Sequence, residues 1–156
     1  MKKLLMIALA SLIGASAFAQ DGKTIYNRYS EADGVSAVYI SPAMFKLMNR
    51  IPDLELQSGN VNLGPIIKSL TGMYIIDSEN PAINEDIKRD VDRFIRRGDY
   101  EILLEAKENG EVTRIYTMGP ESTVTGFVLF SFEGDECNFI CINGEIPREA
   151  LEELIN

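Results

Sequence analysis

The chain has 156 residues, with 15 lysines and arginines against 24 aspartates and glutamates, and a net charge of −9 at neutral pH. This excess of acid disfavours binding to nucleic acid or to anionic membrane surfaces, although it is equally an aid to solubility. The sequence contains no histidine and no tryptophan. Histidine-based triads, histidine general bases and histidine metal sites are therefore excluded.

Residues 1–19 have the three parts of a bacterial secretory signal peptide. Met1-Lys2-Lys3 is a basic start, an apolar run follows, and Ala17-Phe18-Ala19 forms a cleavage box. A retained hydrophobic helix is the alternative, but the run is short for a bilayer span of ~20 apolar residues. We expect cleavage after Ala19 and a mature chain that begins at Gln20.

The residue after the cleavage box indicates where the mature protein goes. A lipoprotein would have a cysteine there, whereas this chain has Gln20. We therefore expect a periplasmic or secreted protein with no lipid anchor and no transmembrane segment. We also expect a flexible mature N-terminus over 20–34, which includes the P-loop-like Gly22-Lys23-Thr24, and a single domain over 35–156.

Alternating and helical patterns predict the elements from residue 35 onward. In chain order we expect a strand over 35–40, helices over 43–49 and 64–70, a strand over 73–76, a helix over 80–97, strands over 100–107, 112–118, 124–132 and 137–142, and a helix over 148–155. The segment 51–59 is expected to be a loop, and 100–107 would also tolerate a helix.

This order, β-α-α-β-α-β-β-β-β-α, predicts an α+β domain with a mainly antiparallel sheet and helices packed on one face. Local signals support the element boundaries. Ser41-Pro42 and Asn80-Pro81 are typical helix starts, and Gly98 is a natural stop. Asn109-Gly110 is a strong hairpin signal between two of the strands.

Two cysteines in an exported chain raise the question of a disulfide. Cys137 and Cys141 lie four residues apart on one expected strand, which places them ~13 Å apart, whereas a disulfide needs Cα atoms within ~7 Å. We expect two free, buried thiols beside Phe139. A Cys-x-x-x-Cys metal pair has no histidine or third cysteine to complete a zinc site.

Carboxylates are plentiful, so composition alone leaves a paired-carboxylate hydrolase open. The densest acidic loop contains Glu133, Asp135 and Glu136, but it lacks the ligand spacing of a calcium loop. We interpret it as a solvated hairpin turn. The sequence predicts no catalytic residue, no metal and no cofactor.

The segments 124–132 and 137–142 depart from the alternation of a one-sided sheet. Apolar side chains occur on both expected faces of these two strands. One face carries Phe127 and Leu129 with Ile140 and Ile142, and the other carries Val128, Phe130 and the cysteines. Either both faces are covered, by the N-terminal segment and the C-terminal helix, or the first group is an exposed patch that binds a partner.

Three segments resemble a known family. They are Val35-Ser36-Ala37-Val38-Tyr39-Ile40-Ser41-Pro42-Ala43-Met44, Leu70-Thr71-Gly72-Met73-Tyr74-Ile75-Ile76 followed by Ser78-Glu79-Asn80, and Arg97-Gly98-Asp99-Tyr100-Glu101. They are similar to the domain of unknown function 4252 family of small exported proteins from Gram-negative bacteria. The resemblance covers roughly 34–154, and it carries over no catalytic or binding residue, because none is established for the family. Family members are often lipoproteins, from which this chain departs. Some relatives are encoded near genes for alternative sigma factors, so the resemblance hints at a link to envelope signalling.

The leading hypothesis is an exported, non-enzymatic interaction domain of the bacterial cell envelope. Its partner would be another envelope protein or a second copy of the chain, and its candidate binding residues are Phe127, Leu129, Ile140 and Ile142. The alternative is a small carboxylate-based hydrolase or a small-ligand-binding protein. A deep pocket lined by several acids would favour that alternative.

Overall fold

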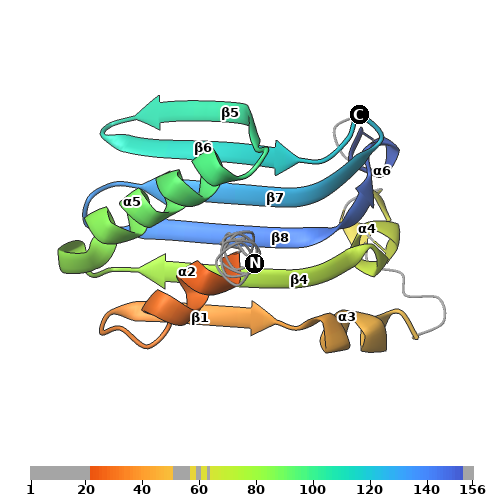
Figure 1. Cartoon of the computed structure of the whole chain (residues 1–156), viewed down its shortest axis with the longest axis horizontal. Helices are drawn as coiled ribbons and strands as arrows, with labels where there is room; N and C mark the ends of the chain where they lie inside the picture. Colours follow the sequence, from red (N-terminus) through yellow and green to blue (C-terminus); the bar gives the residue numbers. More distant parts are fainter. Residues whose placement is uncertain (1–21, 51–56, 59–60, 63, 153–156) are drawn as a thin grey trace, which may run out of the picture.

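A six-stranded antiparallel sheet forms the centre of the fold in the computed structural model (Figure 1). The structure describes residues 22–50, 57–58, 61–62 and 64–152. The sheet strands are β1 (Val35–Ile40), β4 (Leu70–Ser78), β5 (Glu101–Glu108), β6 (Glu111–Met118), β7 (Thr123–Phe132) and β8 (Cys137–Pro147), in the spatial order β1-β4-β8-β7-β6-β5. The predicted α+β class and antiparallel sheet are confirmed.

The helices described are α2 (Gly22–Tyr29), α3 (Pro42–Met48), α4 (Gly64–Lys68), α5 (Pro81–Arg97) and α6 (Arg148–Glu152). A two-stranded hairpin pairs β2 (Gln57–Ser58), which lies within the expected loop 51–59, with β3 (Val61–Asn62), which follows that loop. The cleavage box and the apolar run of residues 1–19 lie outside the described residues. No helix among the described residues has the length and apolar character needed to cross a bilayer.

Helix α2 corrects the expectation of a flexible N-terminus. Ile25 and Tyr29 are one helical turn apart, and both are buried against the sheet. Gly22 allows the start of the helix to approach β8 closely, because a Cβ atom there would lie 2.7 Å from Cys141 Sγ. Most other residues of α2 are polar, so the sequence lacks the longer apolar pattern by which a buried helix face is recognised.

The long helix α5 crosses the same face of the sheet as α2 (Figure 1). Asn80 caps its first turn by accepting a hydrogen bond from the Ala82 amide at 3.0 Å, as the sequence predicts. Its buried apolar residues, at helical spacing, are Ile87, Val91 and Phe94. The Asn84 amide also donates to the Gly134 carbonyl at 2.9 Å, which ties α5 to the β7–β8 turn.

Strands β5 to β8 follow one another along the chain and pair in that order. Asn109 and Gly110 have φ values of 51° and 93°, so both residues adopt the left-handed conformation of a two-residue hairpin turn. Strand β5 pairs with β6 along its length, which resolves the helix alternative in favour of a strand. Strand β8 then pairs with β4 on its other side and thereby joins the two halves of the chain.

The main core lies on the face that α2 and α5 cover, which we call the first face. It buries the first-face residues of the central strands, among them Tyr74, Ile76, Val128, Phe139 and both cysteines. The three short helices pack instead at one end of the opposite, second face. There Phe45, Leu70, Val124 and Ile146 form a smaller cluster, to which α4 and α6 add Ile66 and Leu151.

Candidate functional site

The four candidate binding residues come together on the second face of the sheet. Phe127 lies opposite Ile142, and Leu129 lies opposite Ile140, in the register of the adjacent strands β7 and β8. Each of the four side chains is partly buried. The broken alternation in these two strands therefore does correspond to one contiguous apolar group.

The short helices divide this group into two pairs. Phe127 and Ile142 pack against the smaller cluster at the end of the second face. Leu129 and Ile140 belong to neither core cluster of the described residues. Their neighbours across the strands shield them from the sides, so partial burial here does not mean that a layer lies above them. The candidate surface is therefore centred on Leu129 and Ile140, away from the short helices.

The pairing registers extend Leu129 and Ile140 into a row that crosses the whole sheet. Directly opposed residues share a face, and the row takes one residue from each strand. We call this the apolar row, and its members, in spatial order, are Val38, Ile75, Ile140, Leu129, Ile115 and Leu104. With strands about 4.8 Å apart, six strands give a row roughly 24 Å long.

No residue of the apolar row packs against either core cluster of the described part of the chain. Its two ends are the most open, with Val38 48% and Leu104 46% exposed. Val38, Ile75, Ile115 and Leu104 are not among the binding residues predicted from the sequence. The sequence does contain a signal for Ile75 and Ile115, because the strands that carry them are apolar on both faces. Only the strand order, however, places all six residues side by side.

Charges are distributed unequally between the two faces. The lysine and arginine of the six sheet strands, Lys107 and Arg114, lie opposite Val112 and Phe130 on the first face. On the second face, the side of the row away from the short helices carries Asp77, Glu108 and Glu111. This border of the apolar row is therefore acidic.

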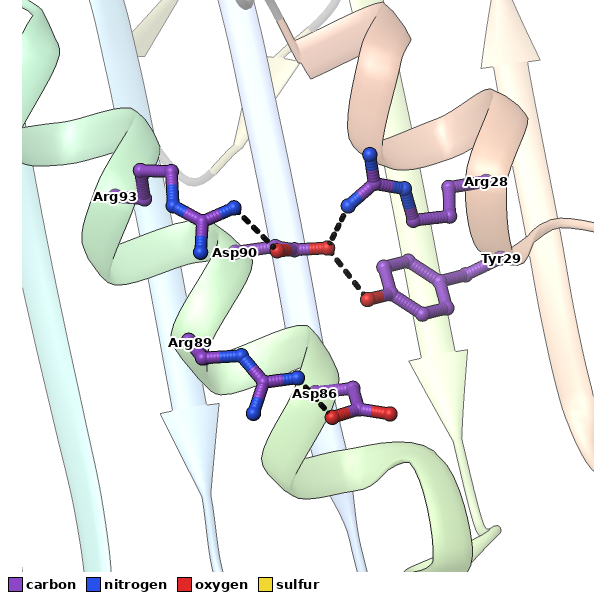
Figure 2. Close-up of polar contacts among 6 residues, drawn as sticks. All are labelled: Arg28, Tyr29, Asp86, Arg89, Asp90 and Arg93. Atoms are coloured by element: carbon purple, nitrogen blue, oxygen red, sulfur yellow. Dashed lines mark hydrogen bonds and ion pairs between the residues drawn. The ribbon is translucent and has the colours of Figure 1, made fainter.

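A buried carboxylate lies on the opposite side of the sheet, between α2 and α5 (Figure 2). Asp90 Oδ2 accepts hydrogen bonds from Arg28 Nη1 at 2.5 Å and from the Tyr29 hydroxyl at 2.6 Å. Arg93 Nη1 lies 3.4 Å from the other carboxylate oxygen. Burial and the bond to Asp90 raise the pKa of Tyr29, and the same carboxylate raises the pKa of Arg28. The two arginines balance the negative charge of Asp90, and the contacts from Arg28 and Tyr29 join α2 to α5.

The hydrolase hypothesis calls for a cavity lined by several acids, and a surface cavity of about 380 Å³ contains two. Asp99 and Glu101 line it, together with Arg148, Thr117 and the turn Met118-Gly119-Pro120. Two exposed acids beside an arginine are fewer than the several acids that would favour the hydrolase hypothesis. Within the described residues, no cluster of three or more potential metal ligands occurs.

Cys137 and Cys141 are not bonded to each other, as predicted from their spacing, and both are buried on the first face. Burial raises the pKa of the Cys137 thiol from an ordinary value of 9.0 to about 12. A thiol of this kind is protonated and unreactive at neutral pH. The cysteines therefore act as small packing residues beneath α2.

Comparison with known proteins places the chain in a family. The model of the family described as "Domain of unknown function (DUF4252)" matches residues 29–154. The chain belongs to the DUF4252 family. Neither the curated proteins nor the solved structures compared with the chain contain a match.

The DUF4252 match begins at Tyr29, the last residue of α2, and includes all six sheet strands. Both the apolar row and Asp90 fall within the matched residues. Most of α2 precedes the match, and this part includes Arg28, which pairs with Asp90.

Proposed function

We propose that this DUF4252 protein is an exported, non-enzymatic interaction domain of the bacterial cell envelope, and that the apolar row is its binding surface. The observation that carries the proposal is the row itself: six apolar side chains side by side, outside both core clusters of the described residues. A contiguous apolar surface of this kind is typical of protein interaction sites. The resemblance to exported envelope proteins supports the same compartment.

The charges around the row indicate what kind of partner it takes. The acidic border of Asp77, Glu108 and Glu111 and the net charge of −9 both favour a cationic neighbour. The partner is therefore a protein segment with an apolar stripe and lysine or arginine residues along one side. A helix of about 16 residues would match the length of the row, at 1.5 Å per residue.

A designed peptide tests this surface. The probe is a 16-residue amphipathic helix of leucine and lysine, compared with a leucine–glutamate peptide of the same pattern. We expect the lysine peptide to bind at least about tenfold more tightly, since opposite charges would flank the same apolar contact. NMR chemical-shift changes should be largest at Ile75, Ile115, Leu129 and Ile140.

The substitution Leu129→Lys should abolish peptide binding while the protein remains folded, because Leu129 lies outside both core clusters. Leu47→Lys is the matched control, since it makes the same change at a side chain that is 58% exposed on α3. Equal binding of the two peptides, or binding that survives Leu129→Lys, would contradict the proposal. A large loss of melting temperature in Leu129→Lys alone would show that the residue is core.

Export is tested separately by intact-mass measurement on protein recovered from the periplasm or the medium. We expect a chain that begins at Gln20 with no added lipid mass. A chain that retains residues 1–19, or carries a lipid, would refute this part of the proposal. The hydrolase alternative makes a different prediction, namely a catalytic activity that Asp99→Asn and Glu101→Gln remove and Leu129→Lys leaves intact.

A further inference from the structure

Strand β5 is an exposed edge of the sheet. It is the outermost strand on its side, and all eight of its residues are exposed. Three consecutive apolar side chains, Ile102, Leu103 and Leu104, are 54%, 58% and 46% exposed. Because an edge strand presents backbone N–H and C=O groups to solvent, an apolar one is a template for pairing with another strand.

The opposite edge differs from β5 in its surroundings. Strand β1 has Tyr39 stacked on Tyr74, with ring centroids 5.0 Å apart, and Tyr26 of α2 packs beside both rings. On β5, a register shift between Ile102 and Leu104 is the one irregularity, and the strand contains no proline. From Leu104 to Glu108, β5 is regular and paired on one side only.

The sequence of β5 selects one register for pairing with a second copy. Two copies related by a two-fold axis pair antiparallel around a single residue, because opposed residues must share a face. Centring on Glu105 or Lys107 would place like charges opposite each other, which is destabilising. Centring on Leu104 would place the irregular Leu103 opposite Glu105.

Centring the pairing on Ala106 avoids opposed like charges and keeps the paired residues within the regular part of β5. Ala106 then lies opposite itself, and Glu105 of each copy lies opposite Lys107 of the other. Glu105 is held ionised for this role, since Lys107 and Arg114 lower its pKa and contact its carboxylate at 2.9 Å and 2.7 Å. Five residues of each strand, Leu104–Glu108, pair within the regular part of β5.

We propose that a second copy of this chain occupies the β5 edge, and that the two copies form one continuous twelve-stranded sheet around Ala106. Each face of one copy continues into the same face of the other. Ala106 of one copy therefore meets Ala106 of the other on the second face, and Leu104 of each copy lies opposite Glu108 of the other. The two apolar rows end at the joint with an offset of four residues, about 13 Å. This inference does not rest on the proposed function, because it needs only the edge strand and its charges.

Sedimentation velocity on the chain from Gln20 onward tests the proposal, since every described element lies within that chain. We expect a concentration-dependent dimer. Lys107→Glu should weaken dimerisation by about tenfold, because two attractive cross-strand pairs become repulsive. Ala106→Lys should abolish the dimer, since it places two ammonium groups side by side at the axis. Circular dichroism should show both variants folded, as both sites are exposed.

The charge-exchange double variant, Glu105→Lys with Lys107→Glu, restores the opposed pairs and should recover the dimer. Lys46→Glu is the matched control, because it makes the same charge change at an exposed site on α3. A monomeric wild type at about 100 μM, the upper end of ordinary assay concentrations, would overturn the proposal. So would a dimer that tolerates Ala106→Lys and Lys107→Glu but is lost in Leu129→Lys, since that dimer would use the sheet face.

Discussion

Individual residues on the first face show how little space separates α2 from the sheet. A Cβ atom on Gly22 would lie 2.7 Å from both Cβ and Sγ of Cys141, and 3.2 Å from the Tyr74 ring. Distances this short are not sustained between packed atoms, so any side chain here must push the helix away from β8. Glycine at this position is therefore a packing requirement.

The substitution Gly22→Ala should lower the free energy of unfolding by about 1–3 kcal/mol, the usual cost of overpacking a core. Urea unfolding followed by circular dichroism measures this change. Lys23→Ala, one residue along α2 and exposed, is the control and should shift the free energy by no more than about 0.5 kcal/mol. Equal stability of Gly22→Ala and wild type would mean that α2 can move off the sheet at no cost.

The buried thiol of Cys137 makes stability depend on pH in the alkaline range. Its pKa is about 12 in the folded chain, against an ordinary value of 9.0. Below pH 9 both states keep the proton, so this residue leaves stability unchanged there. Between pH 9 and 12 the unfolded chain releases the proton and the folded chain retains it, so stability falls by at most about 1.4 kcal/mol per pH unit.

We expect Cys137→Ala to lose less stability than wild type between pH 8 and pH 11. Urea titrations at both pH values measure the two losses, and the comparison cancels the contributions of other titrating groups. Thiol labelling provides a second readout: at pH 8 the native protein should not react, and the unfolded, unreduced protein should show two thiols. Equal losses in the two proteins would contradict the buried state of Cys137.

Between elements, one carboxylate joins the N-terminal helix to the long helix. Asp90 is reached by Arg28 and Tyr29 from α2 and by Arg93 from its own helix (Figure 2). Its side chain is 10% exposed, whereas Arg28 is 50% exposed. One turn earlier, Asp86 pairs with Arg89 at the surface, with 50% and 61% of the two side chains exposed.

The two aspartates form a matched pair for mutation. Asp90→Asn removes the negative charge that binds two arginines and a tyrosine. It should lower the free energy of unfolding by about 1–3 kcal/mol. Asp86→Asn, in the same helix, should cost no more than about 1 kcal/mol, because exposed ion pairs contribute little. Chemical denaturation of the two variants measures both values. Similar costs at the two positions would mean that Asp90 does not secure α2.

Across the whole molecule, the two faces of the sheet differ in what covers them. Helices α2 and α5 cover the first face, whereas the short helices α3, α4 and α6 pack at one end of the second face. The remaining apolar row is the surface on which the proposed function depends. In the two proposals made above, the acidic border of the row and the charges of β5 would supply the specificity that an apolar surface alone lacks.

Much of this arrangement follows from local signals in the sequence. Asn109-Gly110 predicts the β5–β6 hairpin, Asn80-Pro81 predicts the start of α5, and the cysteine spacing predicts that the two cysteines are not bonded to each other. Apolar residues on both faces of β7 and β8 also identify Leu129 and Ile140. Each of these signals depends on residues that are close together along the chain.

The remaining features depend on contacts between distant segments. Helix α2 was missed because only Ile25 and Tyr29 of its residues are large and buried, and this pair stabilises a helix only when the sheet lies beneath it. The apolar row was missed beyond β7 and β8 because its other members come from β1, β4, β5 and β6. Their alignment requires the strand order, which local patterns do not contain.

The position of β8 has a consequence for the order in which the chain can fold. This strand is the last of the sheet in sequence, yet it lies between β4 and β7. The N-terminal strands have no partner among β5 to β7, so the sheet cannot close until Cys137–Pro147 is available. A protein that is translocated across a membrane as an unfolded polypeptide must not fold before translocation is finished. In this topology, the strand that completes the sheet is the last sheet strand to leave the ribosome, and under the proposed export it would be the last sheet strand to cross the membrane.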